Sequence, residues 1–186
     1  ALEETGRNPR YLTPAHLTGV TAGTFDGAPL AESELIVLAV PSRTFGEVAD
    51  ALPGNAPVLI LTKGLDPATG NRLSTRVVDR PVAMLSGPNM AEEIADGLPT
   101  ATVIASLDRE LAERLQDAIT SMVFRVYVNA DLVGFDLCPP AQTVLAPPAG
   151  GVAGLGPRST PRTRPLPPAL SRTPPAPQAS AARAEP

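Results

Sequence analysis

The chain has 186 residues and 23 prolines, more than twice the usual proline share of about 5%. Thirteen prolines lie in residues 139–186, which hold five arginines and one acid, whereas residues 1–138 hold 10 basic and 18 acidic residues. The longest strictly apolar run, Leu35–Val40, is too short to span a bilayer. An acidic front part and six aromatic residues in all argue against a nucleic-acid-binding surface.

Cysteine and histidine are each present once. This count excludes an internal disulfide and a cysteine-based zinc site, and it argues against a histidine-dependent catalytic triad. We therefore expect no metal site. The N-terminus has no apolar segment typical of a secretory signal, so we expect a reduced, cytoplasmic protein that binds neither membrane nor nucleic acid.

Short apolar segments alternate with amphipathic ones in residues 1–138. Strands are predicted over residues 35–40, 57–62, 81–85, 100–105 and 123–128. Helices are predicted over residues 43–52, 71–79 and 89–96. A further helix is predicted between the last two strands, where apolar residues repeat at helical spacing: Leu111, Leu115, Ala118, Ile119 and Met122. This alternation predicts an α/β domain, a parallel sheet with helices on its faces. Residues 157–186 consist mainly of Pro, Ala, Arg, Ser and Thr, which predicts a disordered tail.

Three consecutive strands end in distinctive residues. The first delivers Pro41 and Ser42, the second Lys63 and Gly64, and the third the segment Ser86–Asn89. Ligands bind outside the carboxyl ends of strands in such sheets, so we expect these residues at one binding edge.

Lys63 is the only lysine of the chain. An ammonium group beside a glycine suits a phosphate or a polarised oxygen, although a solvated lysine in a loop is the alternative.

Asn89 and Glu92 have the spacing of a helix capping box, and Gly97 has the position of a helix C-terminal glycine. The helix N-terminus could receive an anion, and ordinary capping without a ligand is the alternative.

Six short motifs occur in register over about 130 residues. They are Asn8-Pro-Arg-Tyr-Leu12, Val37-Leu-Ala-Val-Pro-Ser42, Thr62-Lys-Gly64, Leu85-Ser-Gly-Pro-Asn89, Gly97-Leu-Pro-Thr-Ala101 and Phe124-Arg-Val-Tyr127. Together they resemble the NAD(P)-dependent glycerol-3-phosphate dehydrogenases of bacteria, in particular actinobacterial forms. The resemblance implies hydride transfer between glycerol 3-phosphate and dihydroxyacetone phosphate, with NAD or NADP as cofactor, in the synthesis of glycerophospholipids.

The resemblance also implies roles for individual residues. Lys63 would contact both substrate and cofactor, and Gly87 and Asn89 would contact the substrate. Ala91 would lie at the nicotinamide cofactor. We also assign Pro41 and Ser42 to the cofactor side.

Two departures from the family pattern stand out. The chain begins in what resembles the segment after the first βαβ unit, so we expect an incomplete Rossmann-like sheet without the glycine-rich dinucleotide turn. Gln142 stands where the family has its catalytic lysine, and an amide has no proton that titrates near neutral pH. Residues 139–156 therefore resemble a degraded start of the helical substrate domain, interrupted by prolines. We expect a family member truncated at both ends, with no catalytic residue and no activity.

Two other functions stay open. The chain could be a non-catalytic binding module that displays its basic, proline-rich tail to a partner. It could also be another dehydrogenase that acts on a different phosphorylated or acidic substrate. A homodimer is left open in each case.

Overall fold

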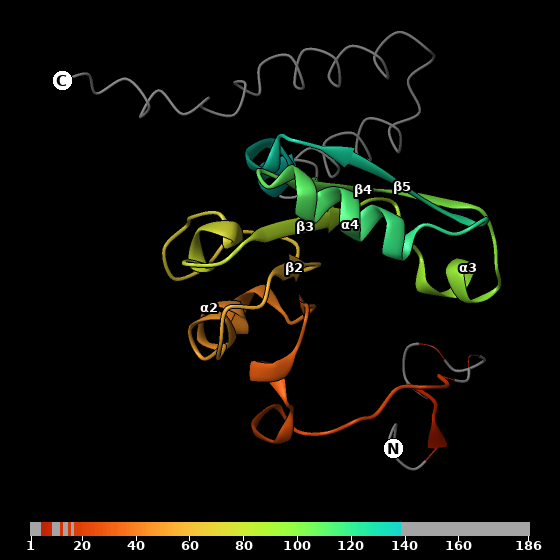
Figure 1. Cartoon of the computed structure of the whole chain (residues 1–186), viewed down its shortest axis with the longest axis horizontal. Helices are drawn as coiled ribbons and strands as arrows, with labels where there is room; N and C mark the ends of the chain where they lie inside the picture. The colour runs from red at the N-terminus through yellow and green to blue at the C-terminus, as the bar shows by residue number, and fades with distance from the viewer. Residues whose placement is uncertain (1–4, 9–11, 13–14, 16, 139–186) are drawn as a thin grey trace, which may run out of the picture.

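The computed structural model describes residues 5–8, 12, 15 and 17–138 and shows a five-stranded sheet flanked by helices (Figure 1). The strands are β1 (Ile36–Leu38), β2 (Val58–Ile60), β3 (Val82–Ser86), β4 (Thr100–Ser106) and β5 (Phe124–Asn129). The helices are α2 (Ser42–Asp50), α3 (Ala91–Ala95) and α4 (Arg109–Ile119), with short 3-10 turns η1 (Phe25–Gly27), η2 (Leu30–Glu32) and η3 (Leu73–Arg76). Residues 132–138 are also helical. All five predicted strands and the α/β class are confirmed.

The strand order is β1-β2-β3-β4-β5, and β4 differs from the prediction because it runs antiparallel to β3. The connection between them explains the difference. A helix of five residues such as α3 rises about 7 Å, whereas a five-residue strand such as β3 extends about 16 Å. The chain therefore starts β4 at the edge where β3 ends. As a result, the first residues of β4 lie at the same edge of the sheet as the carboxyl ends of β1, β2 and β3.

The central strands of the sheet are covered on both faces, as their continuous apolar runs predict, whereas most side chains of β5 are exposed. One face packs against α2, η3 and the helix 132–138 through the buried residues Ile36, Leu38, Phe45, Leu52, Val58, Ile60, Leu73, Val77, Met84, Ala105 and Leu132. The other face packs against α4 through Leu59, Ala83, Ile104, Leu111, Ala112, Leu115 and Val126. Val37 belongs to the second face but is 49% exposed, so α4 leaves the β1 end of that face open.

Two helix predictions need correction. Residues 71–79 form only the four-residue turn η3. Helix α3 begins at Ala91, and Asn89 does not cap it, because the Asn89 side chain bonds to a threonine of β4. The capping-box prediction is therefore wrong, because the Asn89 side chain bonds to Thr102 and not to the backbone amides at the start of α3.

The predicted end of α3 is confirmed. Gly97 has a φ of +74°, the left-handed conformation that glycine adopts without a steric penalty. The amides of Gly97 and Leu98 bond to the carbonyls of Ile94 and Glu93, at 3.1 and 2.9 Å. This is the hydrogen-bond pattern of a Schellman motif.

Within the described ranges, none of the helices has the length and apolar character that crossing a membrane requires. The predicted segments 139–156 and 157–186 lie outside the described residues.

Candidate functional site at the carboxyl ends of β1, β2 and β3

The loops that follow β1 and β2 lie side by side. Thr62 donates its hydroxyl hydrogen to the carbonyl oxygen of Val40 at 2.7 Å and thereby ties the two loops together. Gly64 has a φ of +114°, and a Cβ there would lie 3.6 Å from Cβ of Ser42. Pro41 precedes α2, and its carbonyl accepts the amide of Thr44 at 3.0 Å. The parallel strands thus bring Pro41, Ser42 and the Lys63 loop to one edge, as predicted.

Lys63 connects this edge to the turn after β3. Its ammonium group donates to the carbonyl oxygen of Gly87, with 3.4 Å between Nζ and O. Lys63 is exposed, so the group also faces solvent. Beside it is a cavity of about 520 Å³, a volume within the usual range of small-molecule sites. Its lining residues are Lys63, Ser86, Gly87, Pro88, Val103, Phe135 and Cys138.

Asn89 is held at the same turn by a residue that sequence reasoning missed. Its amide nitrogen donates to Oγ1 of Thr102 at 3.0 Å, and Thr102 donates to the carbonyl of Ser86 at 3.1 Å. Thr102 is 2% exposed and lies near the start of β4. Its position was not predictable, because it depends on the antiparallel direction of β4.

Two other predicted positions, Ala91 and Gln142, are not among the residues that the structure joins in this hydrogen-bond network. Ala91 is the first residue of α3 and is exposed, and its methyl side chain cannot join the polar network. Gln142 lies outside the described residues. The structure therefore joins Lys63, Gly87 and Asn89 through hydrogen bonds, directly or by way of the Ser86–Thr102 contact.

The helix 132–138 supplies one wall of the cavity through Phe135 and Cys138. Asp136, which is 1% exposed, anchors this helix by accepting the backbone amide of Ser74 at 2.9 Å. Ser74 belongs to η3, 62 residues away in the sequence, so no local pattern could have indicated the contact.

Asp66 organises the loop that follows Lys63. Its carboxylate accepts the amide of Ala68 at 3.0 Å and the hydroxyl of Thr69 at 2.8 Å. Both bonds favour the charged carboxylate and hold the pKa of Asp66 below its ordinary value. The bond from the Ala68 amide has the larger effect, and the bond from Thr69 follows. A weaker attraction comes from Arg76, whose Nε lies 3.8 Å from Oδ2.

We expect Asp66→Asn to lower the melting temperature near pH 7, because a charged acceptor forms stronger hydrogen bonds than a neutral amide oxygen. Since the folded-state pKa is depressed, the stabilisation is full above the unfolded-state pKa of about 3.9 and is lost as pH falls through the folded-state pKa. The difference between the two proteins should therefore shrink from pH 5 toward pH 2. Thermal melts at several pH values measure this, with the exposed Asp117→Asn as control; a difference that stays constant with pH contradicts the assignment.

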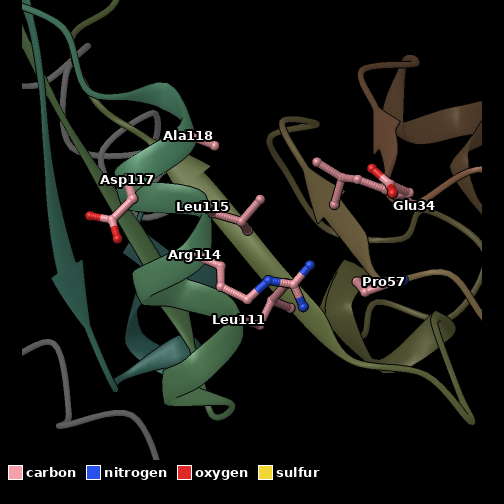
Figure 2. A pocket seen from close by; sticks show the side chains of 8 residues that line it. Glu34, Pro57, Leu111, Arg114, Leu115, Asp117 and Ala118 are labelled. Atoms are coloured by element: carbon pink, nitrogen blue, oxygen red, sulfur yellow. The ribbon is translucent and has the colours of Figure 1, made fainter.

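A second hollow lies at the opposite edge of the sheet, next to α4 (Figure 2). Its volume is about 590 Å³, and Leu35 and Pro57 line it from the amino ends of β1 and β2. Leu115 and Arg114 point from α4 toward the side that carries Glu34 and Pro57 (Figure 2). Its lining is mainly apolar and includes both acidic and basic side chains, without the glycine-lined approach found beside Lys63. We therefore assign the candidate ligand site to the Lys63 edge.

Among the residues that the structure describes, no group of three or more His, Cys, Asp or Glu side chains could hold a metal ion.

Residues 1–112 match the family model described as NAD-dependent glycerol-3-phosphate dehydrogenase N-terminus. The chain belongs to this family. The family resemblance predicted from the six motifs is therefore confirmed.

Individual members of the family support the same conclusion. The glycerol-3-phosphate dehydrogenase [NAD(P)+] of Moorella thermoacetica is 40% identical over 164 residues, which cover 84% of this chain and 49% of that protein. The corresponding protein of Corynebacterium kroppenstedtii is 37% identical over 164 residues, or 82% of this chain and 49% of that protein. The chain thus spans about half the length of the curated relatives it matches.

Solved structures of the family share the fold. The crystal structure of glycerol-3-phosphate dehydrogenase from Coxiella burnetii has a TM-score of 0.69 at 30% identity and covers 83% of this chain and 50% of that one. The structure of the Dunaliella salina protein has a TM-score of 0.79 at 23% identity, over 91% of this chain and 31% of that one. The described sheet is therefore a Rossmann-like dehydrogenase fold.

Proposed function

We propose that the edge formed by Lys63, Gly87 and Asn89 binds dihydroxyacetone phosphate or glycerol 3-phosphate. The observation that carries the proposal is the exposed Lys63 ammonium group beside a cavity of about 520 Å³. A phosphate requires a cation or several donors, and a lysine at a strand end supplies the cation. Glycerol 3-phosphate, for which the curated relatives are named, carries such a phosphate.

We assign the nicotinamide end of NAD or NADP to the same edge of the sheet. Pro41, Ser42 and Ala91 would contact it there from outside the cavity, which none of the three lines. Phe135 and Val103 give the cavity an apolar wall against which an aromatic ring can pack. When bound, the nicotinamide would supply or accept the hydride. The relatives are named for both NAD and NADP.

We further propose that this chain binds its ligand without turning it over. Residue 142 is a glutamine at the position where the family resemblance places the catalytic lysine. A glutamine amide cannot donate and accept a proton near neutral pH, so the carbonyl reduction would lack its acid. The competing function, partner capture by residues 157–186, rests on residues outside the described part.

Ligand-dependent thermal unfolding of the full chain tests the binding. Dihydroxyacetone phosphate should raise the melting temperature, corresponding to about 2.7 kcal/mol at a concentration 100 times Kd. Dihydroxyacetone, which lacks the phosphate, should have little effect. The absence of any shift with the phosphorylated ligand rejects the binding site.

An absorbance assay with NADH and with NADPH tests the lack of turnover. We expect no consumption of either reduced cofactor in the presence of dihydroxyacetone phosphate. Sustained consumption by the purified chain would show that Gln142 does not abolish activity.

A further inference from the structure

Thr102 is a buried polar residue in an otherwise apolar part of β4, and its hydrogen bonds are directional. Its hydroxyl has a single hydrogen, and the carbonyl of Ser86 can only accept, so Thr102 uses that hydrogen on Ser86, at 3.1 Å. Toward Asn89, 3.0 Å away, the hydroxyl can then only accept. The amide nitrogen of Asn89 must therefore face Thr102, and one hydroxyl determines how this amide is oriented.

Gly87 lies between the two residues that Thr102 holds, and its backbone is in close contact with β4. A Cβ at position 87 would lie 3.0 Å from Oγ1 of Thr102 and 3.1 Å from the carbonyl oxygen of Ala101. The turn therefore contacts β4 at three points: the carbonyl of Ser86, the backbone of Gly87 and the side chain of Asn89.

The same turn carries the acceptor of the Lys63 ammonium group. The carbonyl oxygen of Gly87 accepts from Nζ at 3.4 Å, so a shift of the turn shifts the acceptor. Lys63 is exposed, and its long side chain has several rotatable bonds. Within the part of the chain that the structure describes, the carbonyl of Gly87 is the one hydrogen-bond partner of its ammonium group. The place of the ammonium group thus depends on how Thr102 seats the turn.

Asn89 shows that this arrangement is not optimised for hydrogen bonding alone. Its Oδ1 is buried and has no hydrogen-bond partner. Rotating the amide would place this oxygen opposite Thr102, whose only hydrogen is already used on Ser86. Buried acceptors without partners are uncommon in native structures, so hydrogen bonding within the turn does not by itself explain this orientation of the amide.

We propose that Thr102 is a positioning residue of the ligand site, which seats the turn 86–89 on β4 and through the Gly87 carbonyl sets the place of the Lys63 ammonium group. The proposal deepens the proposed function and rests on it only for the effect on ligand affinity. Thr102 acts through other residues and does not itself line the cavity.

The test uses the fact that Lys63 is the only lysine, so selective 13C-lysine labelling of the full chain gives one ε-methylene signal. Thr102→Val removes the hydroxyl and should shift this signal in the ligand-free protein. It should also weaken binding of dihydroxyacetone phosphate about five- to tenfold, the loss expected for about one hydrogen bond. Thr102→Ser keeps the hydroxyl and should restore both.

Thr100→Val is the matched control on the same strand, because the Thr100 hydroxyl donates to the nearby carbonyl of Leu98, at 3.3 Å, and not to the turn 86–89. It should leave the Lys63 signal and the affinity unchanged. An unchanged Lys63 signal in a folded Thr102→Val protein overturns the proposal, as does an equal shift in Thr100→Val. If Thr102→Val does not fold, Thr102→Ala, which places no methyl group against Ser86, is measured in the same way. Because the signal is recorded without ligand, failure of wild-type binding rejects the proposed function alone.

Discussion

Lys63→Met is expected to weaken the binding of dihydroxyacetone phosphate by about 10- to 150-fold. The substitution keeps an unbranched side chain and removes the only ammonium side chain of the protein. A hydrogen bond to a charged group contributes about 1.5–3 kcal/mol, which corresponds to that loss of affinity. Stability should change by less than about 0.5 kcal/mol, because Lys63 is exposed and its bond to Gly87 is long.

Isothermal titration at fixed ionic strength measures this effect, since salt screens the attraction between exposed charges. Arg125→Met is the matched control: it removes one positive charge from the exposed surface of β5. It should bind the ligand like the wild type. Lys63→Arg should bind with intermediate affinity, because it keeps the charge but presents a planar fork instead of a compact ammonium group. Normal binding by Lys63→Met would show that the phosphate is held elsewhere.

Phe45→Ala is expected to cost about 3–5 kcal/mol of folding stability, the usual range for removing a buried phenylalanine. Phe45 is the fully buried residue of α2 and packs in the cluster that contains Ile60, Leu73 and Leu132. A domain of this size has a total stability of about 5–15 kcal/mol, so the variant retains only part of it. Urea denaturation followed by circular dichroism measures the change.

Arg43→Ala, on the exposed side of the same helix, should stay within about 0.5 kcal/mol of the wild type. Under conditions where Phe45→Ala is folded, its affinity for dihydroxyacetone phosphate should be close to normal, because Phe45 does not line the cavity. A loss below about 1 kcal/mol would contradict the packing described for α2.

The strands were predictable because each is a short run of mainly apolar or β-branched residues that is followed by a proline or a polar residue. The predicted runs 35–40 and 57–62 contain β1 and β2, although the paired strands are only three residues long. The prediction over residues 71–79 was poorer, because the helical pattern there yields a single 3-10 turn. In that segment the amide of Ser74 bonds to the distant Asp136, a contact outside the reach of local propensity.

By itself, the sequence determined the α/β class, the family and the position of Lys63 and Gly87 at neighbouring strand ends. These follow from local signals, namely apolar runs, glycines and short motifs in register. Only the tertiary structure decided the direction of β4, the use of the Asn89 side chain and the wall that Phe135 and Cys138 form. The physical reason is that a short α3 returns the chain to the edge where β3 ends, which brings Thr102 against the turn 86–89. A hydrogen bond across 13 or 16 residues then takes the place of the local cap that the sequence pattern favours.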